Sequence, residues 1–477
     1  MGAEWSRFSY FNPYHRATAN TTVAERDDEN LEDSGENSTE HDVSTGPDWT
    51  RLPYPVLLQV LQLLDETDRY HAALTCTAWL LPLPRPLPCR TGHFKFNPAT
   101  AVKALQCARD HGKSLRHITA DCSVLDNGQR KHTEVVHQFI IILLQADNQQ
   151  LLTLRLTNMS MLTPDTDHPV SSLVKSLAAL LKHQHQLVVL DLSQAGLNVN
   201  QGLRLLNSAT LSSRRTLKTL AIDELIGLNL SFDHLAFQEL LICVIRCTLS
   251  ELDLSYTYLS DNLLYSLALK GRDQLKLMTI RARYKFLVQR VTSAPAWQSL
   301  THSCPSLKVV FYIIPQSDSC SDRSLCNMLT PSLPLHALYW GSEASRTHIT
   351  HGSFQHIATH FQNSLHHLHL HYNFDLNMDG VANLYNSCQN LKTLALCKVC
   401  NSEVEECRQK MLIGYALARH PANPACSVTF NGVDVSGQDP CHTVLSMVGW
   451  CCEQVKIWAG KGWTLVETLV VWFQSFF

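Results

Sequence analysis

The middle of the chain repeats one spacing, L-x-x-L-x-L, in which leucine or another apolar or aromatic side chain fills the fixed positions. Nine copies begin at residues 151, 187, 217, 249, 275, 307, 335, 365 and 391, so the average period is (391 − 151)/8 = 30 residues. Weaker copies begin at Leu115 and Ala425. The stretches between copies, such as 170–181 and 381–388, have the apolar spacing of helices. The pattern therefore predicts a short strand and a helix in each repeat.

A single repeat of this length cannot bury its own apolar face, whereas stacked repeats share one continuous core. We expect an α/β leucine-rich-repeat solenoid over residues 100–433, of about ten repeats, with parallel strands on the concave face and helices on the convex face. A bundle of leucine-rich helices is the alternative. Composition suits either fold, because 73 of the 477 residues are leucine and all but four of these lie between Leu52 and Leu417.

Residues 49–80 predict a small helical module ahead of the repeats. Pro53 and Pro55 suit the start of a helix, and the apolar residues from Val56 to Leu64 follow at spacings of one, three and four. A second helical stretch ends at Trp79. A module of about 35 residues buries too little surface to be stable alone, so it needs a partner inside or outside the chain.

The module resembles the F-box, through Leu52-Pro53, the alternating Val and Leu pairs, Leu64, Asp68, Ala72-Ala73, Cys76 and Trp79. This resemblance implies that the module docks on the Skp adaptor of a cullin-based ubiquitin ligase. The residues it assigns to the adaptor-binding surface are Leu52, Pro53, Val56, Leu57, Val60, Leu61, Leu64 and Trp79. A helical hairpin that caps the repeats is the alternative. After Trp79 the family often has a helical stretch, whereas this chain has a Leu- and Pro-rich spacer at 81–88. We assign residues 49–90 to the F-box and this spacer.

An F-box followed by such repeats resembles the F-box/leucine-rich-repeat substrate receptors, and residues 296–300 and 304–309 are similar to a segment of their irregular-repeat branch. The resemblance implies a non-catalytic subunit of an SCF-type (Skp-cullin-F-box) ubiquitin ligase that brings a protein substrate to ubiquitination and proteasomal degradation. A non-catalytic interaction scaffold without a ligase role is the alternative. The position eight residues after the first leucine is Asn or Cys in the family and varies here, so we expect irregular loops and uneven curvature.

Alternation along each strand predicts which side chains face the concave surface. Acidic residues come first along the repeats, then an arginine, then aromatic residues and finally histidines. The candidate substrate-binding residues are Asp191, Asp223, Glu251, Asp253, Arg281, Phe311, Tyr339, His367, His369 and His371. Such a surface suits a partner with a basic side chain beside an apolar one. A solvated acidic face, with the aromatic residues covered by other parts of the chain, is the alternative.

Charge adds two expectations. The chain has 39 basic and 42 acidic side chains, so we expect no nucleic-acid partner. Residues 1–48 hold 3 basic and 11 acidic residues, a net of −8, with few large apolar side chains, and we expect a disordered tail.

The 17 cysteines are irregularly spaced and no secretory signal precedes them, which favours reduced thiols in the cytoplasm or nucleus.

Sequence patterns for catalysis are absent, namely G-x-S-x-G, the Walker loop, G-x-G-x-x-G and H-E-x-x-H, so we expect neither enzymatic activity nor a cofactor. His369 and His371 project from one face about 6.5–7 Å apart, and His367 adds a third nitrogen, but no fourth ligand is evident and we expect no metal. Cys397 and Cys400 form a lone C-x-x-C, which favours core and loop thiols. No apolar run reaches about 18 residues, so we expect no membrane span.

The segment 434–477 differs from the repeats, because it carries four tryptophans, a Cys451-Cys452 pair and an aromatic end. Three interpretations remain open. It caps the open end of the solenoid, it binds a partner, or it is foreign to the family, as a mispredicted or alternative final exon would be.

Overall fold

The computed structural model describes residues 52–64, 90–96, 98–123, 129–159, 168–227, 234–270, 274–283, 292–314, 327–341, 351–372, 378–398, 413, 426–431 and 433–434. Within these residues, strands and helices alternate along the chain from β1 onward. The helices are α1 (Tyr54–Leu63), α4 (Pro98–His111), α5 (Gln129–Gln145), α6 (His168–Lys182), α7 (Val199–Ser212), α8 (His234–Arg246), α9 (Asp261–Lys270), α10 (Ala294–Ser303), α12 (His351–His360) and α13 (Met378–Ser387).

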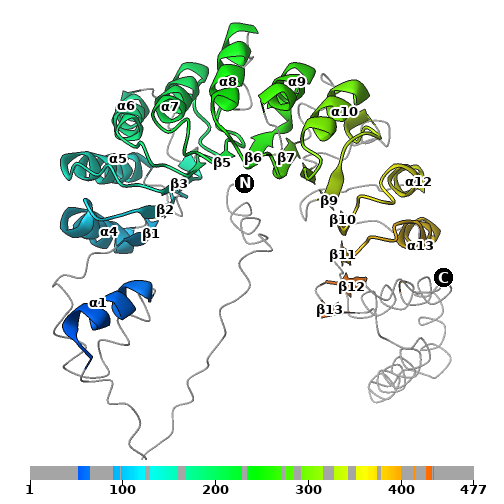
Figure 1. Ribbon diagram of the computed structural model, residues 1–477, viewed down its shortest axis with the longest axis horizontal. Coiled ribbons are helices and arrows are strands. Elements are labelled where there is room, and N and C mark those ends of the chain that lie inside the picture. The colour runs from blue at the N-terminus through cyan, green and yellow to red at the C-terminus, as the bar shows by residue number, and fades with distance from the viewer. Residues whose placement is uncertain are drawn as a thin grey trace, which may run out of the picture.

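The described strands form one open sheet in sequence order. They are β1 (Thr91–Lys95), β2 (His117–Asp121), β3 (Thr153–Thr157), β4 (Val189–Asp191), β5 (Thr219–Ala221), β6 (Glu251–Ser255), β7 (Leu277–Arg283), β8 (Lys308–Ile314), β9 (Leu335–Trp340), β10 (His367–Tyr372), β11 (Thr393–Lys398), β12 (Ser427–Phe430) and β13 (Val433–Asp434). All neighbours from β1 to β12 pair in parallel, and β13 turns back antiparallel. The strands line the inner side of an arc and helices α4 to α13 its outer side (Figure 1). The leucine-rich-repeat solenoid is confirmed.

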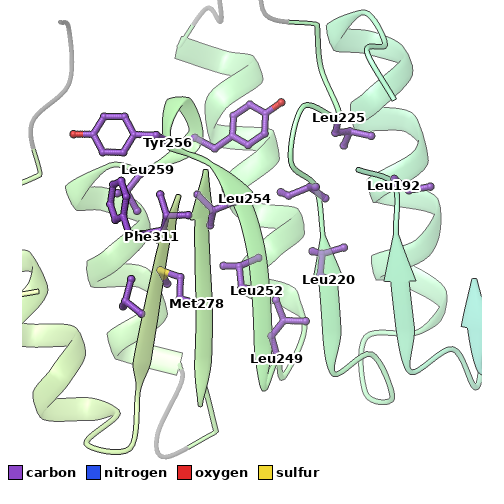
Figure 2. Close-up of a cluster of buried hydrophobic side chains, with 14 of the residues drawn as sticks. Leu192, Leu220, Leu225, Leu249, Leu252, Leu254, Tyr256, Leu259, Met278 and Phe311 are labelled. Carbon is purple, nitrogen blue, oxygen red and sulfur yellow. The ribbon is translucent and has the colours of Figure 1, made fainter. Parts of the chain in front are cut away.

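The core lies between the strands and the helices, and the repeated leucines fill it. Leu190, Leu220, Leu252 and Met278 are direct partners on four successive strands, and each is at most 1% exposed. Figure 2 shows Leu220, Leu252 and Met278 projecting from neighbouring strands into one apolar cluster. Each fully buried side chain of this kind contributes about 1.5–3 kcal/mol. The parallel order therefore follows from the repeat, because only stacked strands bury these positions.

Buried polar side chains connect early repeats where a helix turns into the next strand. The Nδ2 of Asn148 donates to the carbonyl oxygen of Leu115 at 2.8 Å. Gln184 repeats the arrangement one repeat later: its Nε2 donates to the carbonyl oxygen of Asn148 at 2.6 Å, and its Oε1 accepts from the backbone N–H of Leu151 at 3.0 Å. The hydroxyl of Ser213 then donates to the carbonyl oxygen of Gln184. These bonds satisfy carbonyl groups that the apolar repeat leaves buried.

In strand β8 the side chains that face inward differ from those that the sequence predicts. The L-x-x-L-x-L spacing predicts Val310 and Tyr312 inside and Phe311 on the concave face. In the structure the reverse holds: Phe311 is 0% exposed and pairs with the inward Ile280, whereas Val310 and Tyr312 are half-buried on the concave face. Figure 2 shows Phe311 in the apolar cluster beside Leu259. The swap buries a phenyl ring instead of a phenol whose hydroxyl needs a partner.

A register shift beside Val310 returns the next strand to the common pattern. It lies between the Val309–Leu335 and Val310–Ala337 pairs. In β8 the first inward position after Leu307 is Val309, one residue earlier than the L-x-x-L spacing requires. One extra residue on β9 at the register shift offsets this difference, so that the following strands keep the common register.

Several predictions concern residues outside the described ranges. These are the acidic segment 1–48, Trp79, the spacer 81–88, Cys400 and the segment 435–477. Within the described ranges, no helix combines the length and apolarity that a membrane crossing requires.

Candidate functional site

Helix α1 carries two apolar faces. Pro53 and Pro55 start the helix, since proline fits its first turn. Leu57 and Leu61, four residues apart, are 3% and 1% exposed. On the other side, Val56 is 43% and Leu63 is 87% exposed.

The exposed side forms a continuous stripe. Val56, Val60 and Leu63 are spaced by four and three residues, so they lie along one face of the helix. Val60 is half-buried between its two exposed neighbours. We call these three residues the outer face of α1. Exposed apolar side chains in line mark a protein-binding surface more often than isolated ones do.

On the concave side of the solenoid, a buried ion cluster joins three repeats. Both carboxylate oxygens of Asp223 lie 2.9 Å from Nη1 of Arg283, which comes 60 residues later. The Nε of Arg283 lies 3.2 Å from Oε1 of Glu224. Between them, the hydroxyl of Ser255 donates to Asp223 Oδ1 at 2.8 Å and accepts from the backbone N–H of Glu224 at 2.8 Å. The side chains of Arg283 and Asp223 are only 6% and 2% exposed.

The geometry of this cluster fits its burial. Glu224 has a positive φ of 49°, which turns the chain after β5 and brings its backbone N–H back to Ser255. Burial raises the pKa of Glu224, and the nearby Arg283 opposes that rise. A buried guanidinium is tolerated here because two carboxylates and their hydrogen bonds surround it.

A second feature is a row of stacked side chains across β7 to β10, which we call the concave stack: Arg281, Tyr312, Tyr339 and His369. Arg281 lies over the Tyr312 ring, 4.7 Å from its centroid. The rings of Tyr312 and Tyr339 are stacked at 4.4 Å and 10°, and those of Tyr339 and His369 at 4.7 Å and 25°. Asp253 holds the open end, with its carboxylate oxygens 2.8 and 3.2 Å from Nη2 and Nε of Arg281.

The concave stack is ordered before any partner arrives. Each side chain in it is held by the next one, so little side-chain entropy remains to be lost on binding. Burial raises the pKa of Tyr312, so its phenol stays protonated at neutral pH. The stack offers ring edges to a partner, while its ring faces lie largely against each other.

A family model for the F-box-like domain matches residues 49–81, the segment that contains α1. The chain thus carries an F-box-like domain followed by a leucine-rich-repeat solenoid. A leucine-rich repeat-containing protein from Legionella pneumophila is also similar, at 14% identity over 75% of this chain and 98% of its own, with a TM-score of 0.33. The leucine-rich-repeat solenoid is assigned from the strand order and the inward leucines.

The F-box positions divide between interior and surface. Leu57 and Leu61 lie inside the module, where they support it. Pro53 and Val56 are exposed, and Leu52, Val60 and Leu64 are half-buried. The sequence analysis did not select Leu63, the most exposed of the apolar residues of α1, although its spacing of seven from Val56 placed it on the same face.

The predicted concave residues are likewise divided. Half-buried or exposed on the concave side are Asp191, Glu251, Asp253, Arg281, Tyr339, His367, His369 and His371. Asp223 is buried and engaged by Arg283, so it is not open to a partner, and Phe311 belongs to the core. Sequence reasoning missed Tyr312 and Arg283. For Arg283 a signal existed, because a basic residue occupies a position that is apolar and buried in other repeats, such as Leu225.

The histidine-rich strand β10 packs through rings and hydroxyls. His367 Nδ1 lies 2.8 Å from the hydroxyl of Thr393, and His369 stacks on Tyr339. In the part of the chain that the structure describes, no group of three or more His, Cys, Asp or Glu side chains is arranged to hold a metal ion. This strand therefore presents a polar aromatic surface.

Burial lowers the pKa of two histidines at the concave side of the solenoid. The pKa of His336 and that of His369 are each lowered to about 4, first by burial and then by neighbouring positive groups. These neighbours are His366, His367, Lys308 and Lys392 around His336, and His367 and His371 around His369.

We expect the solenoid to lose stability as the pH falls from about 6.5 to about 4. In that window the unfolded histidines bind protons and the folded ones do not, so acid favours unfolding, whereas the full stability is present above pH 7. Urea denaturation midpoints at pH 7.5, 5.5 and 4.5 measure the decline. The variant His336→Gln with His369→Phe should flatten it, and a matched change of the exposed His93 and His302 to Gln should not. Equal declines in both variants would contradict this assignment.

Proposed function

We propose that this chain is the substrate-recognition subunit of an SCF-type ubiquitin ligase. It binds the Skp adaptor, and through it the cullin, by the F-box-like domain, and it binds a protein substrate by the concave face of the solenoid. Its contribution to ubiquitination and proteasomal degradation is proximity, because it positions a substrate beside chemistry that is performed elsewhere in the complex. Such a subunit acts in the cytoplasm or the nucleus, where a fluorescent fusion would localise it.

The observation that carries the proposal is the outer face of α1 within the F-box-like domain. Val56 and Leu63 expose apolar surface to solvent. Such surface is usually buried, either inside the module or against a binding partner. A partner that covers a few such side chains gains most of its binding free energy from them.

The concave side supports the second half of the proposal. The concave stack is preorganised, with the ion pair of Arg281 and Asp253 at its end, and the exposed Glu251 on the same strand as Asp253 adds negative charge to the concave face. This combination suits a substrate in which a basic side chain lies next to an apolar or aromatic one.

The test is co-purification of the intact chain with the Skp adaptor. Val56→Asp with Leu63→Asp should weaken adaptor binding at least about 100-fold, because two charges replace apolar contacts at the centre of the interface. The matched control is Val102→Asp with Leu269→Asp, at apolar residues that are 72% and 81% exposed on other helices. It adds the same charge and should bind normally.

Two outcomes would contradict the proposal. One is an intact, folded chain that does not bind the adaptor, and the other is normal binding by the Val56 and Leu63 variant. Either result favours a repeat scaffold that binds partners without ubiquitination.

A further inference from the structure

The edge of the sheet where the strands begin is positively charged. The residue after each repeat's first leucine is Lys or His in six of the seven consecutive repeats that open from Leu217 to Leu391, with Ser250 as the exception. We call these residues the basic row: Lys218, Lys276, Lys308, His336, His366 and Lys392.

Backbone hydrogen bonds place these residues one above another. Except at Lys308, the carbonyl oxygen of each member before Lys392 accepts from the backbone N–H of its counterpart in the next repeat. The N–H of Lys276 bonds to Ser250, that of Lys308 to Lys276, and that of Lys392 to His366, at 2.7–2.9 Å. Members on neighbouring strands are therefore one strand spacing apart, about 4.8 Å, and Lys218 and Lys276, with Ser250 between them, are two spacings apart. Only the register shift between β8 and β9 interrupts the series.

No lysine of the basic row forms an ion pair within the part of the chain that the structure describes. Lys218, Lys276, Lys308 and Lys392 are exposed. Among the described residues, the carboxylates in ion pairs pair with Arg281 or Arg283 instead.

The loops at this edge reinforce the charge, since Arg214 and Arg215 lie exposed just before Leu217. Glu251 is an acidic neighbour of the row, and its carboxylate accepts a hydrogen bond from Thr219 at 3.2 Å. The acidic side chains Asp223, Glu224 and Asp253 lie toward the opposite ends of the strands.

We propose that the basic row binds an extended acidic segment of a partner protein. Lysines that recur along one edge of the sheet match carboxylates spaced along an extended chain. None of the four exposed lysines forms an ion pair within the described residues, so their charge is available to a partner. The inference goes beyond the proposed function, because it concerns the edge of the solenoid and holds whether or not the adaptor is bound.

The observations favour an acidic polypeptide over other anions. A nucleic acid is bound by dense charge together with open aromatic faces, whereas Tyr312 and Tyr339 stack on each other and the lowered pKa of His336 keeps it neutral. Phosphorylated segments are recognised by arginine clusters, whereas the basic row consists of lysines and histidines.

The test is fluorescence anisotropy with the purified full-length chain and a labelled 16-residue peptide of alternating Glu and Ser, at low salt. Lys276→Glu, Lys308→Glu and Lys392→Glu together should weaken binding at least tenfold. The matched control reverses three exposed lysines away from this edge, Lys95, Lys103 and Lys175, and should change the affinity less than twofold. A variant with Gln in place of the same three lysines removes the positive charges without adding negative ones, so its affinity should fall by a smaller factor. It also serves as a control in case the triple Lys→Glu variant misfolds.

Four results would overturn the proposal. They are equal weakening in row and control variants, equal binding of a Gln/Ser peptide, and tighter binding of a single-stranded RNA of the same charge. The fourth is a tenfold gain in peptide affinity on deletion of residues 1–48, which would make the chain's own acidic segment the occupant of the row.

Discussion

Replacement of Arg283 by alanine is expected to lower the free energy of unfolding by about 3–5 kcal/mol, the cost of leaving a buried charge without its partner. Asp223 would keep the hydrogen bond from Ser255 but lose both contacts at 2.9 Å, and Glu224 would lose its contact at 3.2 Å. Because the ion pair spans 60 residues, its loss also uncouples the β5 repeat from the β7 repeat. Urea denaturation followed by circular dichroism measures the change.

A double variant separates the loss of attraction from the burial of charge. Arg283→Met with Asp223→Leu removes both charges and keeps apolar volume, so it should recover more than half of the stability that Arg283→Ala loses. Lys270→Ala, at an exposed site, provides the control and should stay within about 0.5 kcal/mol of the unchanged protein. A stability loss below about 1 kcal/mol for Arg283→Ala would show that the cluster is solvated rather than buried.

Much of the fold could be predicted from the sequence, because the L-x-x-L-x-L spacing recurs nine times and each copy places the same positions in the core. Leu154, Leu190 and Leu394 lie inward where the spacing puts them, and their strands pair in parallel as predicted. The β8 register could not be predicted in this way. The template fixes spacing but not the relative cost of burying Phe311 and Tyr312, and that cost decides the register.

The site could be predicted less completely. Period-two alternation selects Arg281, Tyr339 and His369 for the concave side, but their assembly into one stack depends on Tyr312, which the template placed inside. The ion cluster joins positions 60 residues apart, two repeats along the chain, so no single repeat contains both partners.

The orientation of helix α1 could not be predicted from the sequence. Nearly every position of α1 is apolar, so the sequence does not say which side packs inward. The structure places Leu57 and Leu61 inside and Leu63 outside. Substitution of Leu57 or Leu61 would therefore disrupt the module itself, and only outer-face variants separate adaptor binding from folding.

The β8 register leads to the second large stability effect. Phe311→Ala should lower the free energy of unfolding by about 3–5 kcal/mol, since it removes a fully buried ring and leaves a cavity among packed neighbours. Tyr312→Ala should cost only about 1 kcal/mol, because it removes ring stacking at a half-buried surface position. Both losses follow from urea denaturation midpoints of single variants at pH 7.5.

The two variants form a decisive pair because they differ by one residue and one face of the strand. With the template register, Tyr312→Ala would be the severe change and Phe311→Ala the mild one, so the order of the two losses decides between the registers. Val309→Ala and Val310→Ala repeat the comparison without aromatic rings, and the inward Val309 should again cost more than Val310. If Tyr312 and Val310 prove the costly positions, Phe311 faces the concave surface and the concave stack must be rebuilt around it.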